Sequence, residues 1–155
     1  MSDAKDLHQK HDVVIIDVAG VSSKSLLYAA GVAHFVVIPS QPSEDDLVEA
    51  IKTRKIVSNA EEMLGREIPN AILLTRVRAK TQVLAHSLQQ IIGLKIPFFE
   101  SVIHDRTIYQ KTRFSGSTPI SADSKSDAAK EIEAFAYELM QNIKKANTQV
   151  NKKAS

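Results

Sequence analysis

Short apolar runs alternate along this chain with longer segments of mixed polarity. Nearly uninterrupted apolar residues occur within 12–17, 33–38 and 70–75, and charged residues, proline or glycine stand near the ends of each run. Runs of this length are typical of buried parallel strands, because helices cover both faces of such a sheet. A fourth run, at 96–103, is interrupted early by Pro97. We therefore expect four strands.

Helices are predicted between these runs. Segment 43–64 carries apolar residues at helical spacing, Ser43 is a favourable N-cap, and Gly65 can end the helix. Its buried side is expected to include Leu47, Ile51, Ala60 and Leu64. Other elements expected are a helix at 23–30 that Gly31 can end, a helix at 81–92, and a short helix or ordered loop at 104–114.

A long helix is expected near the C-terminus. Ser124-x-x-Asp127 resembles a capping box with aspartate in place of glutamate, so the helix should begin there. Apolar residues then recur at helical spacing, and we expect all of them in the core: Ile132, Phe135, Ala136, Leu139, Met140 and Ile143. After Lys144 the chain is polar apart from Val150, which predicts a frayed end.

Strands that alternate with helices predict an α/β fold. Connections of this kind give parallel strands with right-handed crossovers, so we expect a small, mainly parallel sheet flanked by helices. A chain of 155 residues suits one domain with one core. We assign that domain to 11–145, with a polar N-terminal arm at 1–10 and a polar, disordered tail at 146–155.

Composition narrows the class of protein. Hydrophobic residues make up 43% of the chain and charged residues 25%, which is ordinary for a soluble globular protein. The chain has no cysteine, which excludes disulfides and thiolate metal sites. No apolar run is long enough to span a bilayer, and segment 1–10 is too polar for a secretory signal. These features predict a cytoplasmic protein without a membrane span.

Charge is unevenly distributed, although the net charge is only +2. Residues 1–75 contain seven basic and eleven acidic side chains. Residues 76–116 contain seven basic side chains against only Glu100 and Asp105. This second segment is either an anion-binding face or a solvated surface that lacks acids.

One acidic residue, Asp17, stands where open α/β sheets place their chemistry, at the C-terminal end of the first predicted strand. In P-loop nucleotide hydrolases an aspartate at this place holds Mg²⁺, directly or through water. The alternative is a structural acid at the start of a loop. Segment 20–25 is not predicted to be a phosphate loop, because a Walker A loop needs glycine where Val18 and Ser23 stand. The five histidines are too scattered for a metal site.

Several segments, in this order, resemble the ParA/MinD family of deviant-Walker ATPases, which partition plasmids and chromosomes or position division sites. Segment 13–20 resembles the Walker B strand and the switch after it, and 35–43 resembles the next strand and its Ile-Pro-x-x-Pro loop. Segment 71–76 resembles the strand that ends near the adenine, and 101–106 with 116–120 resembles a base-binding loop and the signature after it. The resemblance covers residues 11–145, corresponding to the C-terminal two-thirds of the family.

The resemblance implies a truncated P-loop NTPase-like, three-layer fold in which Asp17 is a magnesium ligand. It also implies that Thr75, Arg76 and Asp105 bind the nucleotide. ParA-like proteins hold nonspecific DNA on a basic surface, and by region and charge the candidates here are Arg76, Arg78, Lys80, Lys111 and Arg113. The partners implied are nonspecific DNA, a partition-complex or other protein, and a second copy of the chain.

Departures from the family change the expected activity. The family's K-G-G-x-G-K-T loop precedes the Walker B strand by several dozen residues, whereas only ten residues stand there in this chain. His104 stands where the family often has proline. Mg-ATP is the family's cofactor, but without the phosphate loop we expect no ATP binding or turnover by this chain alone. Asp17 is then the remnant of a magnesium site.

Three hypotheses of function remain. The first is a ParA-like partition or DNA-transfer protein that binds DNA or a partner protein without turning over ATP. The second is an active partition ATPase whose P-loop part lies upstream or on another chain. The third is an unrelated α/β binding domain in which Asp17 is structural or a phospho-acceptor. Whether the chain acts as an enzyme depends on which of the three holds.

Overall fold

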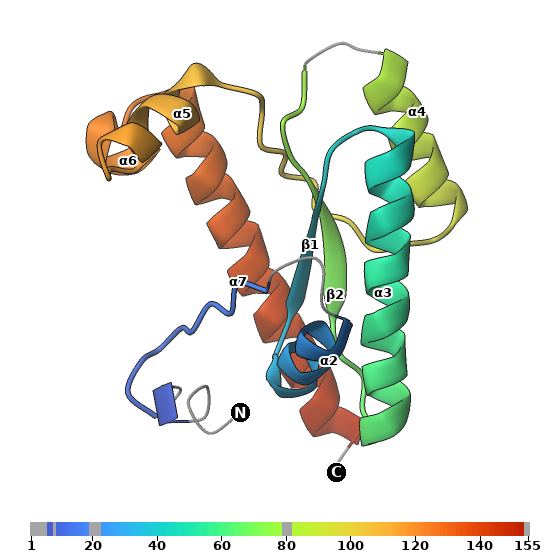
Figure 1. The fold of residues 1–155 in the computed structure, drawn as a ribbon. Coiled ribbons are helices and arrows are strands. Elements are labelled where there is room, and N and C mark those ends of the chain that lie inside the picture. The colour runs from blue at the N-terminus through green and yellow to red at the C-terminus, as the bar shows by residue number, and fades with distance from the viewer. Residues whose placement is uncertain (1–5, 8, 19–22, 79–81, 154–155) are drawn as a thin grey trace. The chain divides into compact units, whose positions relative to one another are not determined.

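The computed structural model describes residues 6–7, 9–18, 23–78 and 82–153. Its elements follow in the order α2 (Ser23–Val32), β1 (Val36–Ser40), α3 (Glu44–Leu64), β2 (Asn70–Leu74), α4 (Gln82–Gly93), α5 (Thr107–Phe114), α6 (Pro119–Ala122) and α7 (Asp127–Lys153) (Figure 1). The chain divides into two compact units. Unit 1 comprises Met1–Val36 and Ile51–Asn70, and unit 2 comprises Val37–Ala50 and Ala71–Ser155.

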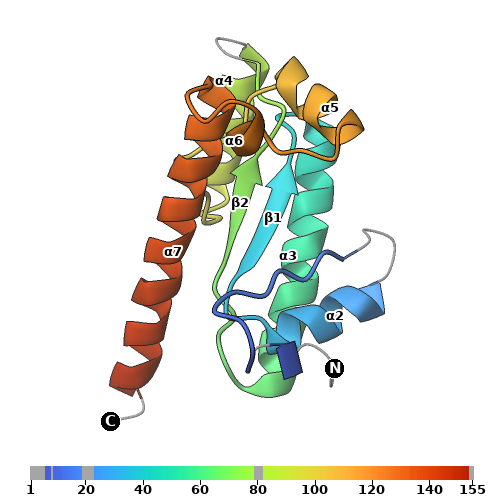
Figure 2. The same ribbon diagram turned by 90° about the vertical axis from the view of Figure 1, so that its left-hand side faces the viewer.

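The structure is mixed α/β, with β1 and β2 running parallel in one sheet (Figure 2). These strands confirm the predictions at 33–38 and 70–75, although β1 starts and ends later than predicted. β1 runs through Pro39, which lacks the N–H of a ladder residue. Val36 and Ser40 bond towards the β2 side, so Pro39, at the alternate position, directs its backbone away from β2.

The predicted first strand, at 12–17, is not formed. Residues 13–18 are neither helical nor paired with any strand of the described chain. The side chains of Val13, Ile15 and Ile16 are 59%, 88% and 43% exposed. β-branched residues favour a strand only where a neighbouring strand supplies backbone partners and cover. The prediction of a buried strand here is therefore wrong for the described residues.

The predicted fourth strand, at 96–103, is reduced to isolated parallel bridges. Ile72 pairs with Phe98, and Val77 pairs with His104. Between the bridges, the backbone N–H groups of Glu100 and Ser101 donate to the carboxylate of Glu138, at 2.8 and 2.9 Å. These N–H groups are not available to a strand ladder. The predicted strand is therefore formed only as isolated bridges, because at Glu100 and Ser101 a side chain of α7 takes the place of a backbone partner.

Unit 1 is organised around four buried residues: Ala30, Val57, Ala60 and Ile68. Arg66 joins the ends of its two helices, since Nη2 donates to the carbonyls of Gly31 and Ala33 at 2.8 and 3.3 Å. Gly31 lies inside α2, so the prediction that it ends the helix is wrong. A Cβ at this position would lie 3.4 Å from Cδ1 of Leu64, which places α2 close to α3 here.

α3 begins and ends as predicted. The Asp46 N–H donates to Ser43 Oγ at 3.2 Å, and Gly65 has a φ of 63°, in the left-handed region that commonly ends helices. The predicted burial of Ile51 and Leu64 is wrong, because these side chains are 36% and 51% exposed. The predicted burial of Leu47 and Ala60 is confirmed, and the buried stripe of the helix also includes Ala50 and Val57.

The core of unit 2 collects residues from several elements, and Figure 1 shows α4 and α7 on opposite sides of the strands. Ile72 and Leu74 of β2 and Ile91 of α4 are buried. Phe99 is 1% exposed and meets Phe135 of α7 edge to face, with ring centroids 5.1 Å apart and planes at 80°. Edge-to-face pairs of this kind are favourable beyond the apolar area they bury.

α7 departs from its prediction at both ends. Its N-cap is Ser126 and not Ser124, since the Ala129 N–H donates to Ser126 Oγ at 3.2 Å. Residues 123–126 form a tight turn, in which the Ser126 N–H donates to the Asp123 carbonyl. Because of this turn, the helix begins only at Asp127. The helix continues to Lys153, so the segment predicted as a tail is largely helical.

The apolar stripe of α7 is only partly covered. Phe135 is half-buried, whereas Met140 is 41% exposed, so the prediction that every stripe residue lies in the core is wrong. Within the described ranges, none of the helices is long and apolar enough to cross a membrane.

We predict that Phe99→Ala lowers the free energy of unfolding by about 3–5 kcal/mol, because it leaves a cavity beside Phe135. Urea denaturation measures the change. The matched control is Phe114→Ala, which removes a side chain that is 94% exposed and should change stability by less than about 0.5 kcal/mol. Equal effects of the two substitutions would contradict the assigned core.

Candidate functional site

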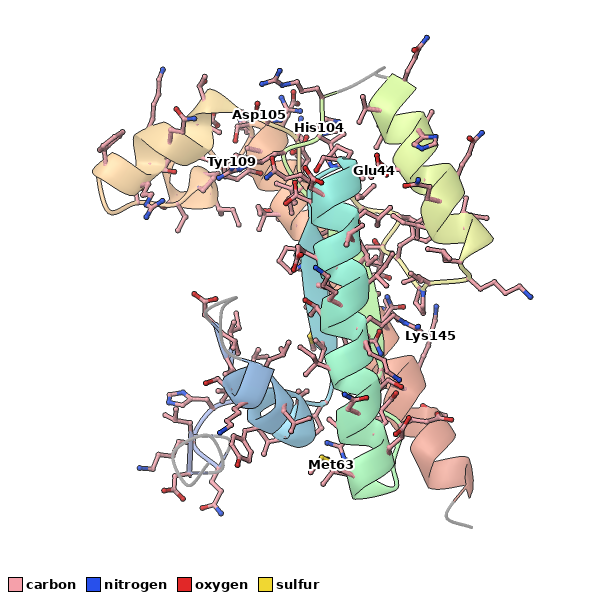
Figure 3. All side chains as sticks on the ribbon, turned by 45° about the vertical axis from the view of Figure 1, so that its right-hand side comes forward. Glu44, Met63, His104, Asp105, Tyr109 and Lys145 are labelled. Carbon is pink, nitrogen blue, oxygen red and sulfur yellow. The ribbon has the colours of Figure 1, made fainter. Side chains whose placement is uncertain are left out.

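The end of β2 is joined to the segment that precedes α5. The Val77 N–H donates to the Ile103 carbonyl at 3.1 Å, and the Asp105 N–H donates to the Val77 carbonyl at 3.0 Å. Val77 is 1% exposed and anchors this junction in the core of unit 2. The junction brings together four residues predicted from the sequence: Thr75, Arg76, Arg78 and Asp105. Figure 3 shows His104 and Asp105 here, with Tyr109 on the neighbouring α5.

Thr75 and Arg76 form the turn that leads out of β2. The Thr75 hydroxyl donates to the Ser40 carbonyl at 3.4 Å, beside the backbone bond between the same residues at 2.8 Å. Arg76 has a φ of 50°, which is uncommon for a residue with a Cβ. Its side chain is exposed between the buried residues Leu74 and Val77. The turn therefore presents a cation at the end of the strand.

Arg78 and Asp105 form an ion pair across the junction. Arg78 Nη2 lies 3.4 Å from Asp105 Oδ2, and the two side chains are 79% and 40% exposed. Exposed ion pairs of this kind add little to stability. The pair matters for the site because it holds the predicted nucleotide-binding acid, Asp105, against a predicted DNA-binding cation.

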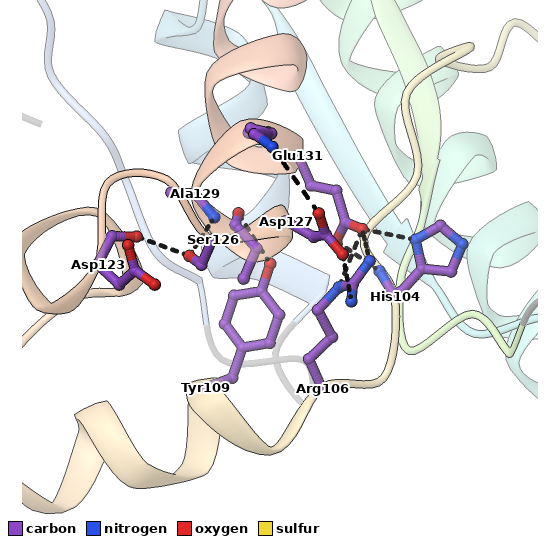
Figure 4. Close-up of polar contacts among 10 residues, drawn as sticks. His104, Arg106, Tyr109, Asp123, Ser126, Asp127, Ala129 and Glu131 are labelled. Carbon is purple, nitrogen blue, oxygen red and sulfur yellow. Dashed lines mark hydrogen bonds and ion pairs between the residues drawn. The ribbon is translucent and has the colours of Figure 1, made fainter.

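Glu131 of α7 is the centre of the polar contacts beside this junction (Figure 4). Arg106 donates to its Oε1 from Nε at 3.0 Å and from Nη2 at 2.6 Å. The His104 backbone N–H lies 3.2 Å from Oε2, and the ring nitrogen Nδ1 lies 2.8 Å from Oε1. Arg106 also lies 3.3 Å from a carboxylate oxygen of Asp127. Two successive turns of α7 therefore hold the residues just before α5.

These contacts set the charge state of the cluster. Burial alone would raise the pKa of Glu131, but the hydrogen bonds from Arg106 and His104 outweigh it, so the pKa lies below its ordinary value. The hydrogen bond to Glu131 raises the pKa of Arg106. Burial raises the pKa of Tyr109, whose hydroxyl lies 3.5 Å from the Ala128 carbonyl. The cluster is thus a stable ion pair at neutral pH.

Glu138, two turns further along α7, repeats the arrangement. Its two carboxylate oxygens accept from the backbone N–H groups of Glu100 and Ser101. Burial favours the neutral acid, but the bonds from Ser101 and Glu100 and the nearby charge of Lys145 together lower the pKa of Glu138. Two carboxylates on one face of α7 therefore fix the whole connection from Glu100 to Arg106.

An open depression of about 420 Å³ lies between the starts of α5 and α7. Its lining combines both signs of charge: Asp105, Arg106, Thr107, Ile108, Ser126, Asp127 and Ala128. In the part of the chain that the structure describes, no three His, Asp or Glu side chains are grouped to hold a metal ion. The contacts beside the depression position the start of α5.

Two further residues predicted from the sequence are Asp17 and Lys80. Asp17 belongs to unit 1, where its side chain is exposed in the unpaired segment 13–18. A single carboxylate supplies one ligand to Mg²⁺, and phosphate oxygens and water have to supply the others. Lys80 lies outside the described residues. Their predicted roles, in magnesium and DNA binding, stay predictions.

α5 carries the two remaining cations of the predicted DNA-binding set. Lys111 and Arg113 lie in its last turn, and both are exposed. Figures 1 and 2 both show α5 at the end of unit 2 where the chain leaves β2. We call the four exposed cations of the turn after β2 and of the last turn of α5 the basic end: Arg76, Arg78, Lys111 and Arg113.

Comparison with known proteins gives a related sequence. No protein-family model matches the chain. The chain is 26% identical to protein ParA of Rhizobium radiobacter over 153 residues, a match that covers 89% of this chain and 67% of that protein. The similarity supports a ParA-like relationship.

The residues that organise the site were not singled out in the sequence. Glu131 and Glu138 stand seven positions apart on a predicted helix, beside its apolar stripe. Two acids on one helical face so close to the core should have been expected to accept backbone hydrogen bonds, because a buried carboxylate needs partners. The spacing of the two glutamates does not indicate which segment donates hydrogen bonds to them.

We predict that Glu131→Gln lowers the free energy of unfolding by about 1–3 kcal/mol, since the amide cannot match the charged hydrogen bonds to Arg106. Chemical denaturation at neutral pH measures the change. Glu133→Gln, which alters an exposed acid on the same helix, is the matched control and should be nearly neutral.

The same cluster predicts a pH dependence. The folded-state pKa values of Glu131 and Glu138 are depressed, so their contribution is complete above the unfolded value of about 4.3 and is lost as the pH falls through the folded values. Thermal unfolding across this acidic range should show a shallower loss of stability for Glu131→Gln than for the unaltered chain. If stability fell equally with pH in Glu131→Gln and in the unaltered chain, Glu131 would not contribute to the pH dependence.

Proposed function

We propose that this protein is a ParA-like, partition-related protein that binds nonspecific DNA through the basic end of unit 2. The similarity to protein ParA over 89% of the chain carries the proposal. Plasmid or chromosome partition, or a related transfer of DNA, takes place in the cytoplasm, where we place the protein. A partition-complex or other protein and a second copy of the chain are the further partners that we propose.

The charge of the basic end supports DNA as its ligand. Arg76, Arg78, Lys111 and Arg113 are exposed, and segment 106–122 contains no acidic residue. Arg106 is excluded from the contact surface, because Glu131 and Asp127 hold it. Exposed cations on a surface with few acids attract phosphates without regard to base sequence. Nonspecific binding is what such an arrangement favours.

We further propose that the chain by itself does not turn over ATP. The printed sequence contains no glycine followed by lysine, and thus no Walker A loop in which backbone amides cradle phosphates. The alternative is an active partition ATPase whose P-loop part lies upstream or on another chain.

The DNA proposal predicts a salt-dependent affinity. Fluorescence anisotropy with a short DNA duplex, repeated over a series of KCl concentrations, gives the slope of log K against log salt. Removing two phosphate contacts with Arg76→Ala and Arg78→Ala should reduce that slope by about 2. Lys24→Ala with Lys55→Ala removes the same charge from unit 1 and should leave the slope unchanged. Binding that does not respond to salt would refute the proposal.

The ATP proposal is tested by calorimetric titration of the chain with Mg-ATP. We expect no saturable binding, because no phosphate loop is present in the printed sequence. Stoichiometric binding that Asp17→Ala abolishes, and that Asp12→Ala preserves, would instead support a working magnesium site. Asp12 is a fitting control because it is an exposed carboxylate close to Asp17 in the same segment.

A further inference from the structure

The last residue of α5 is an aromatic side chain that packs against almost nothing. Phe114 is 94% exposed, the highest value among the exposed large hydrophobic residues of the described chain. Phenylalanine usually contributes to stability by burial, so this side chain gives the fold little. An isolated exposed apolar residue is ordinary in itself. Its backbone setting and the charges beside it indicate a role.

The backbone around Phe114 is closed by a defined helix cap. Gly116 has a φ of 62°, and its N–H donates to the Arg113 carbonyl at 3.3 Å. The Ser117 N–H donates to the Thr112 carbonyl at 2.9 Å. These two bonds are those of a Schellman motif, in which a left-handed residue ends the helix. Phe114 is therefore presented from a fixed turn.

The chain after the cap is also fixed. Thr118 caps α6 reciprocally with Ser121: the Ser121 N–H donates to Thr118 Oγ1 at 3.1 Å, and the Thr118 N–H donates to Ser121 Oγ at 3.0 Å. On the other side, Thr112 is 5% exposed, and its hydroxyl donates to the Ile108 carbonyl at 2.9 Å. A ligand that contacts Phe114 therefore meets a surface that costs little entropy to order.

The charges beside Phe114 match a polyanion. Lys111 stands three residues earlier, which places it on the same face of α5, and Arg113 is the adjacent residue. Segment 106–122, which includes α5 and α6, contains no acidic residue. An exposed aromatic ring on a fixed turn, with two cations close by in the sequence, suits duplex DNA, where apolar side chains insert between base steps while cations contact the backbone.

We infer that Phe114 is a wedge that inserts between base pairs of duplex DNA while Lys111 and Arg113 contact the adjacent phosphates. The inference rests on the proposed DNA binding and adds a contact to the bases themselves. Insertion contributes affinity through stacking, and stacking releases no counterions, so its contribution does not depend on salt. The two kinds of contact can therefore be separated by experiment.

The test compares Phe114→Ala, Phe114→Trp and Lys111→Ala in duplex-binding titrations over a salt series. Phe114→Ala should weaken binding by about fivefold or more at every salt concentration with an unchanged slope, as expected for the loss of one stacking contact. Phe114→Trp should restore the affinity. Lys111→Ala should reduce the slope by about 1. Tyr137→Ala, which removes another exposed aromatic ring, is the matched control and should have no effect.

A second readout tests insertion directly. A duplex that contains 2-aminopurine should brighten when the unaltered chain binds, because unstacking relieves quenching, and should stay dim with Phe114→Ala. Normal affinity and undiminished brightening for Phe114→Ala, combined with weakened binding for Lys111→Ala, would overturn the wedge and leave the proposed DNA binding intact. Absence of duplex binding by the unaltered chain would overturn both. Binding confined to single strands would overturn the wedge.

Discussion

Unit 2 depends on two carboxylates of α7 that accept hydrogen bonds from the backbone of a neighbouring segment. Glu131 and Glu138 between them bond the N–H groups of Glu100, Ser101 and His104. A carboxylate removed from water is costly unless donors replace its hydration, and here backbone and Arg106 donors do so. The same bonds stop the segment from continuing as a strand. These hydrogen bonds therefore determine both where strand pairing stops and how the connection to α5 is held.

That constraint also divides the cations of unit 2 into two groups. Arg106 is turned towards Glu131 and Asp127, where its charge is neutralised. α5 begins at the next residue, and its last turn holds Lys111 and Arg113 in solvent. Arg78, beside Asp105, remains largely exposed. An inward ion pair thus positions a short helix whose last-turn cations, Lys111 and Arg113, remain exposed.

The proposed DNA binding rests on features of unit 2. Unit 2 brings together exposed cations, a rigid capped turn and an exposed aromatic ring, whereas the one predicted metal ligand, Asp17, belongs to unit 1. The similarity to protein ParA covers 89% of this chain, so the likeness extends through most of both units. A protein that holds DNA by phosphate contacts needs no bound nucleotide for that contact, which is why the basic end carries the proposed function.

The sequence by itself determined the elements that local rules control. The span of α3 follows from the Ser43 cap and from Gly65, and the runs at β1 and β2 are long and apolar enough to be read directly. The excess of basic over acidic residues in 76–116 could also be seen in the sequence. Only the tertiary structure decided which apolar runs become strands, because a strand needs a partner that its own residues do not encode. Residues 13–18 have none in the described chain, and 100–101 give their N–H groups to Glu138. The site was decided in the same way: Glu131, some twenty-five residues distant from Arg106, selects which cation turns inward and which remain for a ligand.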